Sequence, residues 1–580
     1  MSNFLFIDKD NFESKIPSED AIRSVFSELH DEVIYYYESN RFIICFPETR
    51  TVKFHKDEER LSICLGAAVY ENKEITTLNL ANALDRLNDQ SNYSDLSGRY
   101  LIIDIDACKA KLITSIFASF PHYVTLDKGM HCSSQYVISK LFNYSIDNES
   151  LIERCLYHCN YRSNFFSSVE RSKPSVIYYH NKMSVDLISY LSGLIKQHDN
   201  IDIAKASRLI SERMESLIKV YSENKSKLSI SLSGGRDSRL LLCQLLKVLD
   251  KDSISLYTVG RNDDIEYSLG KKFSSNYEVS HNVYAPCGLN ENNLASYAKK
   301  ISNINFPVQY KSEFIEYLKE FQPALINTAI PETVLCHMHN FDGDNHPAVN
   351  FIRNRSTILE SNYFKDGELI SKKVEDSAML IWKELRKSLP NDSITNIFFE
   401  LTTFQRDWVY NILRISDYAG ETICVMEDPE ILSILSSIDK KWLSTDDFYE
   451  LIIKEHYKNL YDVPTTRDLT PRKMLNTSPK YLFRHASIYF NCVIKVASLG
   501  YLTASNEKFM KRYIIDNHNE LSSVFTEDYL QLLLNKLSTR NFSTNRVVNF
   551  LKRRFSIDRY LSEYELIIPT CLISLIKAYK

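Results

Sequence analysis

Glycine is scarce in this sequence, with only 13 glycines in 580 residues, against the roughly 7% of an average protein. No low-complexity linker and no internal repeat is found. Because glycines are so few, an adjacent pair of them is informative, and one such pair stands at Gly234-Gly235.

The sequence also lacks a long basic tract and any paired cysteine pattern. Lys and Arg number 70 against 74 Asp and Glu, so a nucleic-acid surface is not indicated and small or neutral partners fit better. The twelve cysteines are scattered, and Cys155 and Cys159 lack the spacing of a zinc site or a disulfide scaffold. We interpret them as reduced thiols that share one buried helix face.

Targeting and membrane-spanning segments are missing as well. The start, MSNFLFIDKDNF, has neither the basic region nor the apolar run of a signal peptide. Residues 566–576 are the most apolar C-terminal stretch, but they contain Pro569 and are about half the roughly twenty residues that a spanning helix needs. We expect a cytoplasmic protein without a membrane segment, and a buried helix at 566–576.

The chain is too long for one core, and its periodicity changes once. Before about residue 190 it consists mostly of short β-branched or aromatic runs bounded by turn residues; from Ile203 long helical patterns dominate, with strands at 228–232 and 253–259 and mainly helix after about Trp382. We expect an α+β domain of stacked sheets over 1–190 and an α/β domain over 200–580. The expected N-terminal strands are 42–46, 61–70, 100–105, 111–116 and 176–179, and the helices are 78–87 and 149–158.

The glycine pair lies between a strand and a helix. Residues 228–232 alternate in polarity like a strand, and residues 239–249 form a leucine-rich helical pattern. Adjacent glycines let the backbone approach a ligand closely, and the amides at a helix N-terminus face it with the positive end of the dipole. The segment 233–238 therefore predicts an anion site.

The other residues of this segment suit a polyphosphate. Ser233 and Ser238 offer hydroxyls, Arg236 and Arg239 add positive charge, and Asp237 offers the oxygen ligand that a phosphate-bound Mg²⁺ needs. The alternative is a tight Gly-Gly turn with a capping serine. The intact Ser-Gly-Gly-x-Asp-Ser pattern favours the ligand site, and the missing Gly-Lys-Ser/Thr excludes a Walker loop.

Ser233-Gly234-Gly235-Arg236-Asp237-Ser238 resembles the pyrophosphate-binding loop of the asparagine synthetase family, which cleaves ATP to AMP and pyrophosphate. Residues 255–260 resemble the family's adenine-binding strand. Residues 417–428 resemble a further motif, in which Glu421 and Asp428 match. Residues 450–454 resemble a basic helix of the family, of which only Lys454 is kept. The resemblance implies ATP and Mg²⁺ as cofactors. It implies ATP contacts from Leu232, Ser233, Gly234, Gly235, Arg236, Ser238, Val259 and Gly260.

Residues 96–104 resemble a strand of the family's N-terminal-nucleophile (Ntn) glutaminase domain. The resemblance implies a glutaminase-like sandwich over 1–190, followed by an ATP-pyrophosphatase domain of the adenine nucleotide α-hydrolase type with a mainly helical C-terminal part. The family's glutaminase needs cysteine after the initiator Met, whereas this chain has Ser2. Serine is the weaker nucleophile without an activating base, so we expect glutaminase activity to be lost.

Two further motifs of the family are only partly preserved in this sequence. Residues 327–333 stand where the family has Ser-Gly-x-Gly-x-Asp-Glu, which implies Glu332 as the second metal ligand beside Asp237 and leaves Ala329 where a base is expected. Glu332 has two alternatives, a displaced base or an acid that only starts a helix after Pro331. The family's late basic residue corresponds best to Lys473, with Arg467 and Arg472 nearby and a solvated loop as the alternative.

The function implied is an AMP-forming ligase that activates a small-molecule or peptide carboxylate as its adenylate for attack by an amine. The implied catalytic residues are Asp237, Glu421 and Lys473, with Glu421 easing loss of the amine proton. The alternative is a catalytically lapsed nucleotide-binding or regulatory protein of the same family. A tRNA-modifying enzyme with the same loop fits less well, because the chain is slightly acidic. The sequence predicts neither the substrates nor the oligomeric state.

Overall fold

The structure is a computed structural model. It describes the chain except for residues 1–2, 50, 88–89, 163, 182–183, 196–200, 262–263, 286–287, 303–311, 321–323, 328–330, 357–358, 467, 469–497, 541–562 and 580.

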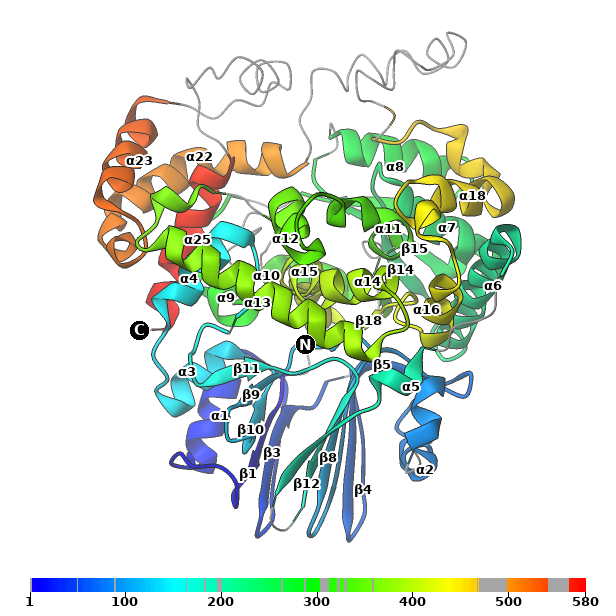
Figure 1. The fold of residues 1–580 in the computed structure, drawn as a ribbon, viewed down its shortest axis with the longest axis horizontal. Coiled ribbons are helices and arrows are strands. Elements are labelled where there is room, and N and C mark those ends of the chain that lie inside the picture. Colours follow the sequence, from blue (N-terminus) through cyan, green and yellow to red (C-terminus); the bar gives the residue numbers. More distant parts are fainter. Residues whose placement is uncertain are drawn as a thin grey trace.

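Two antiparallel sheets are built from strands that all lie before Tyr190 (Figure 1). The six-stranded sheet has the order β11-β9-β10-β1-β3-β2, and the seven-stranded sheet has the order β13-β12-β8-β7-β5-β4 with β6 paired to β5. Their bounds are β1 Leu5–Asp8, β2 Ile34–Glu38, β3 Phe42–Pro47, β4 Val52–Lys56, β5 Arg60–Tyr70, β6 Lys73–Glu74, β7 Leu96–Asp106, β8 Ala110–Thr114, β9 Tyr123–Thr125, β10 Met130–Cys132, β11 Val169–Arg171, β12 Val176–His180 and β13 Val185–Ser189.

The two sheets pack face to face, and alternate side chains fill the space between them. Phe6, Ile44, Ile63 and Ile103, from β1, β3, β5 and β7, are all fully buried in one cluster. Helices α1 Glu19–Ser27 and α3 Gln135–Phe142 pack on the six-stranded sheet, and α2 Leu80–Arg86 packs on the seven-stranded sheet. The same part of the chain also contains α4 Asn148–Tyr157, which packs on α13, and α5 Leu191–Leu194.

The third sheet is parallel and has the strand order β16-β15-β14-β17-β18. The chain enters at the central strand β14, runs to β15 and β16, and then returns to β17 on the other side of β14. A ligand site in such a sheet lies at the carboxyl ends of the two strands between which this order reverses, here β14 and β17. The bounds are β14 Leu228–Ser231, β15 Ile254–Val259, β16 His281–Tyr284, β17 Ala324–Ile326 and β18 Glu421–Ile423.

Helices make up most of the rest of the described chain. Around the parallel sheet run α6 Ile203–Ser222, α7 Arg236–Val248, α8 Ile265–Ser275, α9 Glu291–Ile301, α10 Ser312–Glu320 and α11 Pro331–Cys336. Later helices are α12 Pro347–Phe351, α13 Gly367–Ser388, α14 Asp392–Thr402, α15 Phe404–Ala419, α16 Pro429–Ser436, α17 Lys440–Leu443, α18 Asp447–His456, α22 Ser498–Asp516, α23 Glu527–Thr539 and α25 Glu563–Tyr579. The fold thus combines antiparallel sheets, a parallel sheet and a helical C-terminal part, as expected.

The buried helix expected at 566–576 is present within α25, which keeps Pro569 inside it. It packs on α9 and α22, and the hydroxyl of Tyr579 donates to Ser302 Oγ at 2.6 Å. Ser139 of α3 in turn donates to the carbonyl of Tyr579 at 3.4 Å. Within the described part of the chain, no helix is long and apolar enough to cross a membrane.

The antiparallel and parallel sheets meet where β5 and β7 lie against β18. Arg99 of β7 is fully buried and donates both terminal nitrogens to Asp417 of α15, at 2.7 and 2.8 Å. Its neighbour Gly98 has a φ of +106° and donates its amide to the carbonyl of Glu427 at 2.7 Å. A Cβ at Gly98 would come within 2.4 Å of the Ala67 carbonyl, so this close approach requires glycine.

A second set of buried charges lies at the same junction. Glu421 accepts from Lys53 and forms an ion pair with Lys225 at 3.1 Å, while Glu74 pairs with Lys225 at 2.5 Å. Asp428 accepts from Ser97 at 2.7 Å and from Arg213 at 2.7 Å. Each of these carboxylates is therefore paired with a cation or a hydroxyl from a distant part of the chain.

The Arg99 and Asp417 pair predicts a large and asymmetric effect on stability. Asp417→Ala should lower the free energy of unfolding by about 3–5 kcal/mol, because it leaves a buried guanidinium without its anion. The double variant Arg99→Leu with Asp417→Leu should recover most of that loss, since no buried charge remains. The measurement is equilibrium unfolding in urea.

A control for this measurement is Lys440→Ala, which breaks a pair with Asp342 whose side chains are both 51% exposed. Its effect should stay below about 1 kcal/mol. If the double variant lost as much stability as Asp417→Ala alone, charge burial would not explain the effect.

Candidate functional site

The glycine pair lies at the carboxyl end of the central strand of the parallel sheet. β14 ends at Ser231, Gly235 caps the next helix with φ −78° and ψ 174°, and α7 begins at Arg236. The helix therefore starts three residues earlier than the leucine pattern predicted. Arg236, Asp237 and Ser238 form its first turn, whose amides have no carbonyl partner within the helix.

The two serines close this turn on itself. The amide of Ser233 donates to Ser238 Oγ at 3.0 Å, the two hydroxyl oxygens lie 3.1 Å apart, and the amide of Gly235 donates to Ser233 Oγ at 3.0 Å. Both hydroxyls thus converge on one point beside the helix N-terminus, an arrangement that suits an anionic oxygen.

Gly234 is enclosed on all sides. Its carbonyl accepts from the amide of Thr466 at 2.9 Å, and a Cβ would meet Thr466 Cγ2 at 2.7 Å and Leu269 Cδ1 at 2.9 Å. Its amide donates to Glu266 Oε2 at 2.6 Å. Glu266 lies in the first turn of α8, where Asp264 caps the helix. One loop amide therefore already binds an anionic oxygen, supplied by the chain itself.

Asp237 is held from the side by a tyrosine. Tyr449 of α18 donates its hydroxyl to Asp237 Oδ1 at 2.5 Å. Burial, together with the charge of Asp237, raises the pKa of Tyr449 far above its ordinary value, so this hydroxyl keeps its proton. The Asp237 carboxylate is half-buried and is oriented at the start of α7.

The two arginines of the segment serve protein contacts. The Arg236 guanidinium pairs with Glu450 at 2.8 Å and stacks over the Tyr449 ring at 4.8 Å. Arg239 is fully buried and donates to the carbonyls of Val463 and Pro464 at 2.7 and 2.9 Å. Both guanidinium groups therefore bind other parts of the protein, Glu450 for Arg236 and the two carbonyls for Arg239.

The residues expected to hold adenine lie on the neighbouring strand. β15 pairs with β14, and the amide of Leu232 donates to the carbonyl of Tyr257 at 2.8 Å. Val259 ends β15 half-buried, and the amide of Gly260 donates to the carbonyl of Tyr284 at 2.9 Å. The structure thus brings Leu232, Val259 and Gly260 to the same edge of the sheet as the serines.

Sequence reasoning missed the polar contacts that tie these strands together. The hydroxyl of Thr258 donates to the Leu232 carbonyl and lies 2.8 Å from His281 Nε2. Burial, with a smaller effect of Lys271, lowers the pKa of His281 to about 4, so the imidazole is neutral. Glu266, Tyr449 and His281 lie 28 to 211 residues from Ser238, and no motif marked them.

Several expected site residues cannot be placed in full. Ser2, Ala329, Arg467, Arg472 and Lys473 lie outside the described residues. Residue 332 is in α11, which begins five residues after the end of β17, and its side chain is not among those described. Among the side chains that the structure describes, no group of three or more His, Cys, Asp or Glu could hold a metal.

Glu421 is not at this site, which corrects its expected catalytic place. It begins β18, at the amino edge of the parallel sheet, whereas the serines lie at the carboxyl edge. Burial alone would raise its pKa, but Lys53 and Lys225 outweigh burial and lower it. Its carboxylate is part of the junction with the antiparallel sheets and is not near the 233–238 segment.

Comparisons with known proteins add little. No protein-family model matches the chain, and no curated protein matches it. A solved structure described as the allosteric regulatory enzyme of purine biosynthesis shares 6% identity, over 50% of this chain and 82% of that chain, with a TM-score of 0.24. A likeness this low supports no conclusion about function.

The packing around the two glycines predicts different effects of one added methyl group. Gly234→Ala should lower the unfolding free energy by about 1–3 kcal/mol, because its Cβ overlaps Thr466 and Leu269. Gly235→Ala meets only Ser233 Oγ, at 3.2 Å, and should change stability by less than about 0.5 kcal/mol. Thermal denaturation of the two variants side by side makes the comparison, and equal losses would show that Gly234 is not enclosed.

Proposed function

We propose that this chain is an ATP-dependent, AMP-forming ligase resembling asparagine synthetase, which activates a carboxylate as an acyl-adenylate for attack by an amine. The observation that carries the proposal is the position of the Ser233 to Ser238 segment. It follows the central strand of a parallel sheet, at the point where the strand order reverses, and opens a helix with two converging serine hydroxyls.

The segment fits a pyrophosphate group. The Gly234 amide is bonded to a carboxylate oxygen in this structure, so it already takes an anionic partner, and Gly235 is the less crowded of the two glycines. Ser233 and Ser238 would hold phosphate oxygens with the first amides of α7. Leu232, Val259 and Gly260 would hold the adenine from the adjacent strand ends.

Asp237, with Glu332 as the proposed second ligand, would hold Mg²⁺ in this enzyme. Bound Mg²⁺ neutralises phosphate charge, which favours departure of pyrophosphate. The carboxylate of Asp237 is the hard oxygen donor that Mg²⁺ prefers, and the Tyr449 hydroxyl orients it by donating to its Oδ1. Lys473 remains the proposed cation for the pyrophosphate.

The amine is proposed to be ammonia or an amino group of a substrate. Ser2 stands where a glutaminase needs cysteine, so residues 1–190 are proposed as a degenerate Ntn glutaminase-like domain that releases no ammonia from glutamine. The same loss of the nucleophile is found in the β-lactam synthetase and lasso-peptide cyclase branches of the family that the loop resembles. Appearance of glutamate from free glutamine would contradict this part of the proposal.

A second function is favoured by one observation. Glu266 occupies the Gly234 amide and Tyr449 occupies an oxygen of Asp237, as expected if the chain binds nucleotide without cleaving it. In that case the protein would be a lapsed, regulatory member of the same family. The products formed from ATP distinguish the two functions.

The ligase proposal predicts that Mg·ATP and the correct acid yield AMP and pyrophosphate. Asp237→Asn should lower turnover by at least a hundredfold with little change in unfolding temperature, because the amide keeps the shape but not the charge. Asp250→Asn, at an exposed position, is the matched control and should behave like the parent. Product analysis by chromatography, with each member of an acid panel, gives the readout.

Three outcomes of this assay differ in meaning. ADP and phosphate as the sole products would overturn the proposal. Nucleotide binding without cleavage, for every acid tested and unchanged by Asp237→Asn, would favour the lapsed alternative. Full activity of Asp237→Asn with unchanged Mg²⁺ dependence would remove Asp237 from the mechanism.

Removing the charge of Glu266 should strengthen nucleotide binding, whereas the Asp237 variant should weaken function. Glu266→Gln should tighten binding of a non-hydrolysable ATP analogue by about five- to tenfold, because it removes a negative charge that competes with phosphate for the Gly234 amide. Isothermal titration calorimetry measures the change. Glu278→Gln is the control, since that side chain is 79% exposed and pairs with Lys251. Weaker binding by Glu266→Gln would instead make Glu266 part of the ligand site.

A further inference from the structure

Three histidines form a hydrogen-bonded line through the core of the antiparallel sandwich. His180 ends β12, His131 is in the middle of β10, and His122 directly precedes β9. His180 Nε2 lies 3.0 Å from His131 Nε2, and His131 Nδ1 lies 2.8 Å from His122 Nε2. All three side chains are at most 1% exposed, and the proposed ligase site does not use them.

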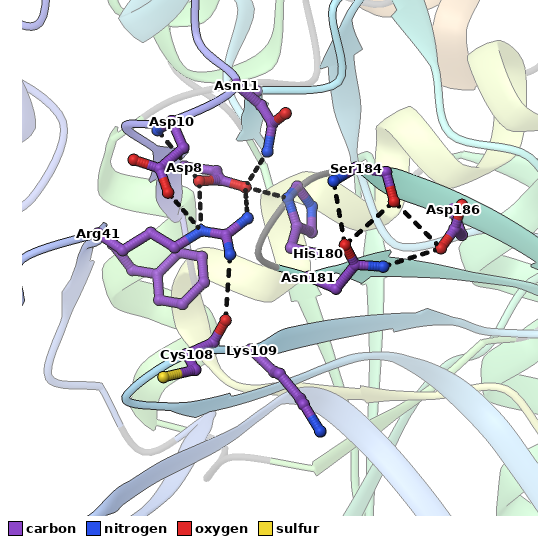
Figure 2. Close-up of polar contacts among 12 residues, drawn as sticks. Asp8, Asp10, Asn11, Arg41, Cys108, Lys109, His180, Asn181, Ser184 and Asp186 are labelled. Atoms are coloured by element: carbon purple, nitrogen blue, oxygen red, sulfur yellow. Dashed lines mark hydrogen bonds and ion pairs between the residues drawn. The ribbon is translucent and has the colours of Figure 1, made fainter.

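Asp8 anchors one end of this histidine line, as Figure 2 shows. Arg41 donates to both of its carboxylate oxygens, at 2.9 and 2.8 Å, and Asn11 donates at 2.6 Å. Burial would raise the pKa of Asp8, but the bonds from Arg41, His180 and Asn11 outweigh it and hold that pKa well below its ordinary value. Asp8 is therefore an ionised, acceptor-only group.

Because Asp8 can only accept, it determines which ring nitrogen carries the proton in each neutral histidine of the line. His180 must donate from Nδ1 to Asp8, at 3.0 Å, so its Nε2 accepts. His131 then donates from Nε2 and accepts at Nδ1, and His122 donates from Nε2. The lone pair left over is on His122 Nδ1, which is buried and has no hydrogen-bond partner in the described part of the chain.

His122 lines a small cavity between the sandwich and α15. The cavity measures about 10 Å³, which is room for one water-sized group. Ser119, Arg171, Arg406, Asp407 and Tyr410 line it with His122. Besides His122 Nδ1, two nitrogens of Arg171, Nε and Nη1, are buried without a hydrogen-bond partner among the described residues. The Tyr410 hydroxyl faces the Glu427 carboxylate, which helps burial to raise the pKa of Tyr410.

Positive charge around this cavity is incompletely balanced. Asp407 pairs with both Arg154, at 3.0 Å, and Arg171. Among the described residues, Arg406 donates to neutral groups, the Ser172 carbonyl at 2.8 Å and hydroxyl at 3.1 Å and, at 3.4 Å, the His122 carbonyl. Asp407 is thus shared by two guanidinium groups, and the other nearby carboxylate, Glu427, is bonded to Ser119. Burial, and repulsion from Arg171, lower the pKa of Arg406 to about 10.

We propose that this cavity binds one small, single-atom anion of the halide class, and that one proton enters the histidine line with it. The anion would accept from Arg171 and from Arg406. It would also face His122 Nδ1, whose lone pair repels a negative charge. Uptake of a proton at that nitrogen turns it into a donor.

The protons balance along the line. A proton added at His122 Nδ1 lets His122 pass its Nε2 proton to His131 Nδ1, and His131 then passes its Nε2 proton to His180 Nε2. The positive charge ends on His180, next to the Asp8 carboxylate, and every hydrogen bond in the line survives with its direction reversed. Other charged or titratable groups that face the line or the cavity are Lys128, Tyr123, Tyr178, Asp407 and Glu427 through Ser119.

The first test is the thermal midpoint of the full chain in sodium bromide or sodium gluconate of equal ionic strength, at several pH values between 6 and 8. Bromide should raise the midpoint and gluconate should not, because gluconate is too large for the cavity. One proton bound with each anion means that the apparent bromide affinity rises about tenfold for each unit by which the pH falls. Equal midpoints in both salts would overturn the anion site, and a bromide effect independent of pH would overturn its link to the histidines.

The second test locates the ion. Crystals of the full chain soaked in bromide should show an anomalous scattering peak among Arg171, Arg406 and Tyr410; water alone at that position would overturn the proposal. Arg406→Gln should abolish the bromide effect on the midpoint, while Arg386→Gln, at a side chain that is 41% exposed, should preserve it. If Arg406→Gln does not fold, the bromide peak in the parent protein decides.

Discussion

Pairing of charges that have no access to water governs how the two halves of this molecule fit together. Arg99 and Asp417, and Glu421 with its two lysines, meet across the junction of β7 and β18. Unpaired, each charge would cost several kcal/mol in such surroundings, so the halves can join in only one register. That register fixes the edge strand β18 and, through β17, the sheet that carries the 233–238 segment.

The two candidate ligand sites differ in how completely their buried charged and polar groups are paired within the protein. At the 233–238 segment the chain supplies its own partners, since Glu266 meets the Gly234 amide and Tyr449 meets Asp237. At the cavity near His122 the pairing is incomplete, because Asp407 pairs with Arg154 and Arg171, whereas the described bonds of Arg406 go to neutral groups. A ligand at the first site has to displace a protein group, whereas a ligand at the second would complete an existing set.

Local patterns predicted much of the fold but only part of the site. The apolar run at 61–70, bounded by turn residues, and the leucine spacing before Leu249 identified β5 and α7, because burial selects such residues over a whole element. Three-residue strands such as β9 and β10 show no such period, and they form through pairing with neighbouring strands, β10 with β1 and β9 with β10 and β11. Glu266 and Tyr449 reach the loop through tertiary contacts that no local pattern encodes. Glu421 occurs in a recognisable motif, yet it begins its strand and so lies at the opposite edge of the sheet.

The contact of α25 with α3 has a consequence for biosynthesis. Ser139 bonds to the carbonyl of Tyr579, so α3, which packs on the sandwich, is covered by a helix encoded 440 residues later. At about 5–20 residues per second, ribosomes take roughly 20–90 s to bridge that interval. During this time the apolar surface around Tyr136 has no cover, and a chaperone that recognises exposed apolar segments would have its longest opportunity to act there.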